Sequence, residues 1–396
     1  MKKLLALLLA SFISWQAISV SAYERPQFYP PAYEVFEEWT EAAAFTGSLE
    51  SKAALLMEAS TGRVLYQQDE TKELPIASVT KIMSTLLVCE AIDKGKISRE
   101  DMVTVSAYAA SMGGSQVYLE PGEQMSVDEL LKCLIVVSAN DAAVALAEHI
   151  YGSVESFVSA MNSRAGELEM KHTLFANTTG LDEDGGGYSC ALDVALMTRE
   201  LLKHPLIFDY TTIWMDTVRD GAFGLSNTNR LVRFYKGANG MKTGFTSEAM
   251  YCLSATALRD GMQLIAVVLG SPSSDKRFAA AKQLLDFGFA NDRVVQPEAV
   301  KIVPLAIKGG CVANVAVSYS PPSLLAEKGN GELVTKTVLK ENLKAPIAKG
   351  QKLGEAIISL EGEELCRVDI TAMHSVEKLN FFGTVKKIWK NILCFV

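Results

Sequence analysis

Apolar residues follow two different patterns along the chain, and the change falls near Asp292. Before that residue, apolar positions at three- and four-residue steps alternate with short apolar runs bounded by turn residues. The first pattern is typical of helices and the second of strands. We therefore expect helices over residues 75–95, 127–137, 141–150, 192–202 and 276–287, and strands over residues 53–57, 64–66, 251–257 and 263–269.

The part of the chain after Asp292 contains short runs rich in Val and Ile, separated by turn residues such as Glu361-Gly362. This spacing predicts a small all-β domain. The runs cover residues 300–304, 312–317, 333–339, 356–360 and 365–370. We therefore expect a mixed domain of helices and strands over residues 51–292, followed by a small β-sandwich domain over residues 293–374.

The first 22 residues have the pattern of a cleaved signal peptide. Lys2 and Lys3 form a short positive start, residues 4–20 carry no charge, and small residues stand at the expected cleavage site, 20–22. An uncleaved membrane anchor is the alternative, although 17 uncharged residues are at the lower limit for a span. Residues 23–50, rich in Tyr, Pro and Glu, are expected to form an extended lead-in.

Residues 375–396 are expected to form an amphipathic helix, because apolar residues recur at three- and four-residue steps with lysines mostly between them. A basic segment with aromatic residues at the end of an acidic protein is typical of a helix that lies in the membrane interface. The alternative is a helix packed on its own domain. The apolar positions are Phe382, Val385, Ile388, Trp389, Ile392 and Phe395 or Val396, and the lysines are Lys378, Lys386, Lys387 and Lys390.

Composition excludes several classes of function. The 396 residues include 38 Lys and Arg against 46 Asp and Glu, a net charge of −8 without a basic block, so a nucleic-acid partner is not expected. The four histidines are far apart and no CxxC pair occurs, so we expect no metal site, and no motif suggests a cofactor. The seven cysteines are scattered and odd in number, which favours buried free thiols over a disulfide framework.

The candidate chemistry begins with Ser78 and Lys81, which lie one helical turn apart. A serine hydroxyl is a weak nucleophile and needs a base. A lysine can serve as that base if burial and a neighbouring cation lower its pKa. The pair alone is weak evidence, because this spacing is common and a capped helix with an exposed lysine is by far the more frequent explanation.

Two further motifs strengthen the case. Residues Ser138–Asn140, with the sequence Ser-Ala-Asn, stand in the break between two expected helices, where polar side chains can be exposed. Residues Lys242–Gly244, with the sequence Lys-Thr-Gly, precede an expected strand. Gly240 and Gly244 leave room for the backbone of a ligand to approach an edge strand.

The three motifs, in this order and 60 and 104 residues apart, resemble the penicilloyl-serine transferase superfamily of penicillin-binding proteins and serine β-lactamases. Within it, the chain is similar to the D-alanyl-D-alanine carboxypeptidase family of low-molecular-weight penicillin-binding proteins. The similarity extends over about residues 45–292 and includes segments 75–83, 138–147, 177–182 and 241–246, and Arg277 ahead of 284–289. It implies an α+β catalytic domain: an antiparallel sheet flanked by helices, plus a helical subdomain.

The resemblance also implies roles for the reacting groups. Ser78 is expected to be the acylated nucleophile, Lys81 its base, and Ser138 a relay that carries a proton toward the leaving amine. The backbone amides of Ser78 and Phe245 are expected to form the oxyanion hole. Family members differ in their side chain at the position of Phe245, so this residue is expected to affect specificity more than chemistry.

The remaining residues are expected to bind the substrate. Asn140 would hold a substrate amide, and Lys242 and Thr243 would face the terminal carboxylate. Lys242 would also help to keep Lys81 neutral. Arg277 would add positive charge for the same carboxylate.

The resemblance implies an exported serine carboxypeptidase, peripheral to the outer face of the cytoplasmic membrane. It would remove the terminal D-alanine from peptidoglycan pentapeptides through an acyl-enzyme, and β-lactams would inhibit it by acylating Ser78. Three alternatives remain. A β-lactamase of class A would need an E-x-x-L-N element between residues 138 and 242, which is missing. An endopeptidase could use the same site on crosslinks. A non-catalytic wall-binding protein would not need the intact motifs.

Overall fold

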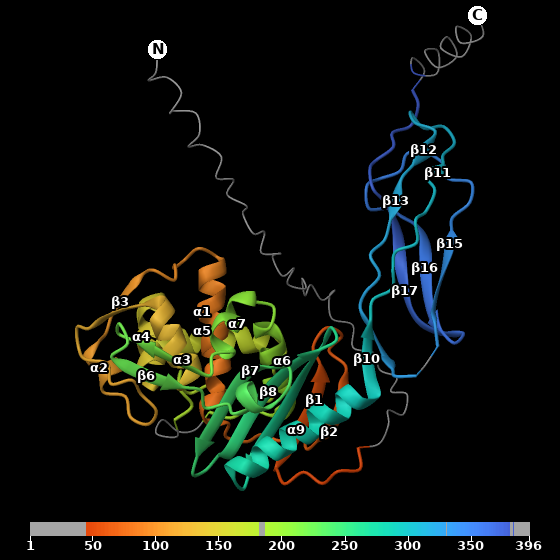
Figure 1. Cartoon of the computed structure of the whole chain (residues 1–396). Coiled ribbons are helices and arrows are strands. Elements are labelled where there is room, and N and C mark those ends of the chain that lie inside the picture. The colour runs from red at the N-terminus through yellow and green to blue at the C-terminus, as the bar shows by residue number, and fades with distance from the viewer. Residues whose placement is uncertain (1–44, 182–186, 330, 381–382, 384–396) are drawn as a thin grey trace, which may run out of the picture.

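The computed structural model describes residues 45–181, 187–329, 331–380 and 383 (Figure 1). The expected signal peptide at 1–22, most of the expected lead-in at 23–50 and most of the expected terminal helix therefore lie outside the described residues. The described chain begins at Phe45, whose ring packs edge-on against the rings of Tyr66 and Phe287.

A five-stranded antiparallel sheet with the order β2-β1-β9-β8-β7 forms the centre of the larger part. Helix α9 (Ser274–Asn291) packs on one face and α6 (Ala191–Leu201) on the other (Figure 1). Neighbouring residues of β1 therefore join different cores: Leu55 joins the core of the helical region, and Leu56 joins the core under α9. Burial on both faces explains why β1 is apolar without alternation. The strands are β1 (Ala53–Glu58), β2 (Val64–Gln68), β7 (Ala238–Thr246), β8 (Met250–Arg259) and β9 (Met262–Ser271).

A helical region covers the α6 face of the sheet. Helix α1 (Lys81–Asp93) contacts α3, α4, α5 and α6, and its buried residues surround its axis, so α1 is apolar on all sides. The other helices are α2 (Ala107–Ala110), α3 (Val127–Val136), α4 (Asn140–Tyr151), α5 (Val154–Glu167), η3 (Pro205–Ile207), α7 (Phe208–Thr211) and α8 (Leu231–Phe234). Two small antiparallel sheets pair β3 (Met102–Thr104) with β4 (Gln124–Ser126) and β5 (Met215–Val218) with β6 (Phe223–Ser226). The predicted α+β class is confirmed.

The expected helices and strands of this part agree with the structure within four residues at each end, with one exception. The helix expected from residue 75 begins as a 3-10 turn, η1 (Ala77–Thr80), and becomes α-helical only at Lys81. Helix α5 was not expected, because its buried residues are only Phe157, Met161 and Ala165, a narrow stripe at four-residue steps.

The smaller part is built of antiparallel strands, as expected. Its four-stranded sheet has the order β13-β17-β16-β15, and Leu353, Ala356 and Ile370 lie in its core. The strand expected at 300–304 is wrong: these residues belong to no strand, and the next strand after β10 starts only after Pro304, which has no N–H to donate. The strands are β10 (Asp292–Val295), β11 (Leu305–Ala306), β12 (Asn314–Val315), β13 (Val317–Ser318), β14 (Leu324–Glu327), β15 (Leu333–Leu339), β16 (Lys352–Leu360) and β17 (Glu363–Ala372).

The expected start of the terminal helix, at residue 375, is wrong. Val376 is buried in the β-domain core and pairs with Ile347, and Lys378 pairs with Gly310. These residues are extended because they complete the β domain. In the described part of the chain, no helix has the length and apolar character needed to cross a membrane.

The described cysteines are free thiols. Cys89, Cys133, Cys190 and Cys252 are buried, as expected, whereas Cys311 is exposed and Cys366 is partly buried.

Candidate active site

Ser78 and Lys81 meet at the junction of η1 and α1. The Nζ atom of Lys81 lies 2.8 Å from the Oγ atom of Ser78 and donates a second hydrogen bond to the carbonyl oxygen of Thr179 at 2.7 Å. Lys81 is fully buried, while Ser78 is partly exposed. The hydroxyl therefore faces solvent on one side and a buried amine on the other.

Ser138 lies in the break between α3 and α4, as the sequence predicted, and Asn140 is the first residue of α4. Ser138 has a φ of +65°, which turns the chain sharply between the two helices. Asn140 donates from Nδ2 to the carbonyl of Gly113 and from its main-chain N–H to the carbonyl of Ser115, both at 2.7 Å. Ser138 Oγ and Asn140 Oδ1 are buried and have no partner among the described residues.

Strand β7 carries Lys242, Thr243, Gly244 and Phe245 at the edge of the sheet. A Cβ atom on Gly244 would lie 3.2 Å from the main-chain N of Ser78, so β7 runs directly against the nucleophile segment. Lys242 is buried and donates to the carbonyl of Thr243 at 3.0 Å. The glycine is required by this close approach.

The side chains of Thr243 and Phe245 on this strand have different surroundings. The hydroxyl of Thr243 donates to the hydroxyl of Thr228 at 2.7 Å. The ring of Phe245 is 55 % exposed and lies 4.4 Å from the ring of Tyr251, centroid to centroid. Phe245 thus offers an aromatic surface at the open end of the site.

Arg277 supports β7 from α9. Its guanidinium donates to the carbonyls of Gly244 at 2.9 Å and Cys252 at 3.2 Å, and it stacks on the ring of Phe278. The side chain is buried, and burial lowers the pKa of Arg277 to about 10. Its charge lies behind the strand, and these donors are already engaged by the protein.

Both lysines of the site have lowered pKa values. Burial lowers the pKa of Lys81 well below its ordinary value, and the charge of Lys242 lowers it further, against the opposing effect of Asp141. Burial and the charge of Arg277 lower the pKa of Lys242 to about 7. A neutral amine next to a serine hydroxyl can accept its proton.

Two contacts of the site were missed by the sequence reasoning. Asp141 is buried directly after Asn140, and its carboxylate accepts hydrogen bonds from the main-chain N–H groups of Val117 and Leu119 at 3.0 and 3.1 Å. It thereby ties down the loop that Asn140 contacts. The second is the carbonyl of Thr179. Segment 177–182 is part of the family resemblance, but no role was assigned to Thr179.

The comparisons with known proteins agree with this geometry. Residues 38–273 match the D-alanyl-D-alanine carboxypeptidase family of serine peptidases, and residues 307–378 match the C-terminal domain of penicillin-binding protein 5. D-alanyl-D-alanine carboxypeptidase DacF of Bacillus subtilis is 43% identical over 346 residues, which cover 85% of this chain and 89% of the relative. The chain therefore belongs to the D-alanyl-D-alanine carboxypeptidase family, and the resemblance read from the motifs is confirmed.

Solved structures give the same result. Penicillin-binding protein 5 of Haemophilus influenzae has a TM-score of 0.75 at 32% identity, covering 85% of this chain and 100% of that one. Penicillin-binding protein D2 of Listeria monocytogenes, solved with ampicillin bound, has a TM-score of 0.55 at 34% identity and covers 62% of this chain and 99% of that one.

Proposed function

We propose that this enzyme is an exported serine carboxypeptidase that removes the terminal D-alanine from peptidoglycan stem pentapeptides. The observation that carries the proposal is the contact of 2.8 Å between Ser78 Oγ and the buried amine of Lys81. Burial and a neighbouring cation lower the pKa of that amine well below its ordinary value, which favours the neutral state that a general base needs. Family membership supplies the substrate class.

The proposed reaction has two halves. Ser78 Oγ attacks the carbonyl of the penultimate D-alanine while Lys81 takes its proton, and the amides of Ser78 and Phe245 stabilise the oxyanion. The C–N bond then breaks, and Ser138 passes the proton to the amine of the departing D-alanine. In the second half, water attacks the acyl-serine ester and restores the Ser78 hydroxyl.

Substrate binding is proposed to use the two sides of the site. The unpartnered Oδ1 of Asn140 accepts from a substrate amide. Lys242 and Thr243 bind the terminal carboxylate from the free edge of β7, and Gly244 leaves space for the substrate backbone. Arg277 contributes positive charge from behind the strand, since its Nη1 donates to the carbonyls of Gly244 and Cys252.

The same site is proposed to bind β-lactams as substrate mimics. A fluorescent penicillin followed by peptide mapping should place the adduct on Ser78, and Ser78→Ala should remove it. Ser115→Ala is the matched control, because the site uses only the main-chain carbonyl of Ser115. Label on another residue, or label that survives Ser78→Ala, would refute the assignment.

Carboxylate recognition separates the carboxypeptidase from an endopeptidase. A charge-assisted hydrogen bond contributes about 1.5–3 kcal/mol, which is roughly a factor of ten to a hundred. Amidating the C-terminus of a pentapeptide should therefore lower kcat/KM at least tenfold. Equal rates on acid and amide would favour the endopeptidase instead.

The C-terminal segment is proposed to hold the enzyme on the outer face of the cytoplasmic membrane. The support is its sequence pattern of apolar and basic residues, which suits an interfacial helix and not a span. Because Val376 and Lys378 belong to the β domain, we now place the start of this segment after Asn380.

A further inference from the structure

The turn after Phe175 contacts the proposed base directly, yet the mechanism above gives it no part. The carbonyl oxygen of Thr179 lies 2.7 Å from Lys81 Nζ, and both residues are buried. A carbonyl oxygen can only accept, so one N–H of the amine is directed at it in either charge state.

This contact restricts the Lys81 amine. A neutral amine has two N–H groups and one lone pair. With one N–H held by Thr179, rotation about the Cε–Nζ bond is limited, and the lone pair can be kept toward Ser78. The carbonyl also stabilises the ammonium that forms when Lys81 takes the proton. In other nucleophile–base pairs, a third group orients the base. The carbonyl of Thr179 would have that role here.

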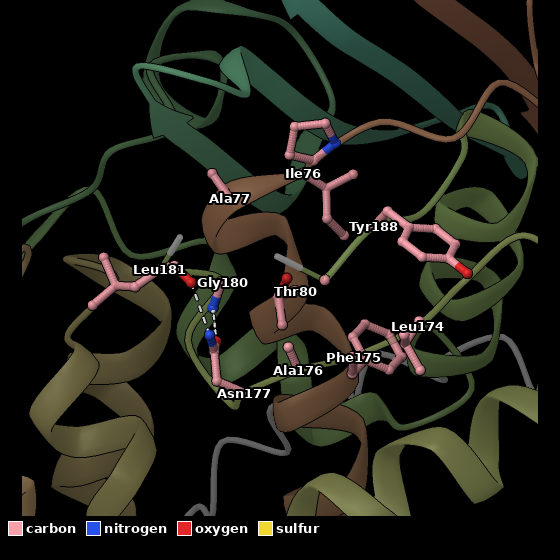
Figure 2. A pocket seen from close by; sticks show the side chains of 12 residues that line it. Ile76, Ala77, Thr80, Leu174, Phe175, Ala176, Asn177, Gly180, Leu181 and Tyr188 are labelled. Atoms are coloured by element: carbon pink, nitrogen blue, oxygen red, sulfur yellow. Dashed lines mark hydrogen bonds between the residues drawn. The ribbon is translucent and has the colours of Figure 1, made fainter. Parts of the chain in front are cut away.

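The side chain of Asn177 shapes the turn that presents this carbonyl. Its Oδ1 accepts from the main-chain N–H of Thr179 at 3.0 Å. The same Oδ1 accepts from the main-chain N–H of Gly180 at 2.6 Å, and Nδ2 donates to the carbonyl of Leu181 at 2.8 Å (Figure 2). Among the described residues, no hydrogen bond between two main-chain groups involves residues 175–181. Side-chain hydrogen bonds therefore hold this segment, and those of Asn177 fix the turn at Thr179 and Gly180.

The turn also packs tightly against the nucleophile segment. Gly180 has a φ of +79°, and a Cβ atom there would lie 1.9 Å from the carbonyl oxygen of Ala77. On the other side, the hydroxyl of Ser84 donates to the carbonyl of Thr178 at 2.7 Å. A shift of the turn would therefore displace the segment that carries Ser78 and the helix that carries Lys81.

We propose that Asn177 is a positioning residue for acylation, which orients the Lys81 amine toward Ser78 through the carbonyl of Thr179. The inference rests on the roles proposed above for Ser78 and Lys81. The other charged groups that act on Lys81 are Lys242 on β7 and Asp141 on α4. Asn177→Ala leaves both of them in place.

The test is the pH dependence of acylation of the full chain by a fluorescent penicillin. Acylation needs neutral Lys81, so its rate constant rises with pH through the pKa of Lys81. Asn177→Ala should lower the plateau rate constant roughly tenfold or more, because the turn no longer holds the carbonyl of Thr179 in place and its hydrogen bond to the charged amine is lost. It should also move the rise to lower pH, because the ammonium loses an acceptor. Binding before acylation should not change. Asn177→Ser, which keeps a shorter acceptor, should recover part of both effects.

Asn162 provides the matched control. Its side chain accepts from the N–H of Phe175 and donates to the carbonyl of Phe175, at 2.9 and 2.8 Å, so it holds the start of the same turn without touching Thr179. Asn162→Ala should lower the unfolding temperature but leave the pH profile in place. An Asn177→Ala profile that is scaled without a shift, or an equal shift in Asn162→Ala, would overturn the positioning role alone. A wild-type enzyme not labelled on Ser78 would overturn the proposed function as well.

Discussion

Replacing Gly244 by alanine tests whether the spacing between β7 and η1 sets the acylation rate. The added Cβ atom would lie 2.6 Å from the carbonyl oxygen of Ile76 and 3.2 Å from the main-chain N of Ser78. Ordinary contact begins at 3.4 Å, so the strand and the turn must separate by about 0.8 Å. Both neighbours are main-chain atoms, so no side chain can rotate to relieve the contact.

The size of the effect follows from this displacement. A shift of 1 Å in a reacting geometry costs about a factor of a hundred in rate. Moving the amide of Phe245 away from Ser78 by most of that distance should lower the acylation rate constant by roughly tenfold to a hundredfold. The fold should survive, because the cores on both faces of the sheet are untouched.

The assay is the second-order rate constant for acylation by a fluorescent penicillin, together with release of D-alanine from a pentapeptide. Gly224→Ala in β6 is the control, since no atom lies within 4 Å of its added Cβ and its φ needs no glycine. It should acylate at the wild-type rate. If Gly244→Ala acylates within about threefold of the wild type, the reasoning from backbone spacing is wrong.

Three further predictions follow from other residues. Lys81→Arg should abolish acylation at neutral pH, measured by penicillin labelling, because arginine keeps its proton; a near-normal rate would exclude the lysine base. Burial raises the pKa of Asp292 to about 6, above its unfolded value, so this group favours the native state when protonated and loses that contribution as pH rises from about 4 to 6. Asp292→Asn should therefore raise the unfolding temperature at pH 8, with the difference vanishing below about pH 4; an equal gain at both pH values would contradict this. A chain ending at Asn380 should stay folded and active on small peptides but leave the membrane fraction, and sedimentation with membranes would refute the anchor.

Contacts between sequence neighbours were predictable. The i, i+3 spacing of Ser78 and Lys81 brings the hydroxyl and the amine together whether the turn is α or 3-10, so the wrong helix type did not matter. The break at Ser138 was predictable for a similar reason, because the apolar periodicity stops on both sides of it.

Contacts across long separations were not predictable from residue types. The carbonyl of Thr179 reaches Lys81 from 98 residues away, and any residue could supply a carbonyl. Arg277 was expected to add positive charge for a substrate carboxylate, but residue types did not indicate that its Nη1 would donate to the carbonyls of Gly244 and Cys252. The end of the β domain was misplaced, because Val376 is apolar and fits either a strand or the start of a helix.

Ala77, which precedes the nucleophile, and Ser138, the proposed proton relay, adopt left-handed backbone angles, with φ of +47° and +65°. Residues other than glycine lose about 1–2 kcal/mol in this conformation. A glycine at either position would relieve that strain in the folded state, yet the chain retains side chains there. Laboratory selection for heat resistance alone would favour changes that relax these two turns, and the relaxed turns would no longer hold the oxygen atoms of Ser78 and Ser138 where the chemistry needs them. A search for a more durable form of this enzyme should therefore leave both turns unchanged and work on the surface of the β domain.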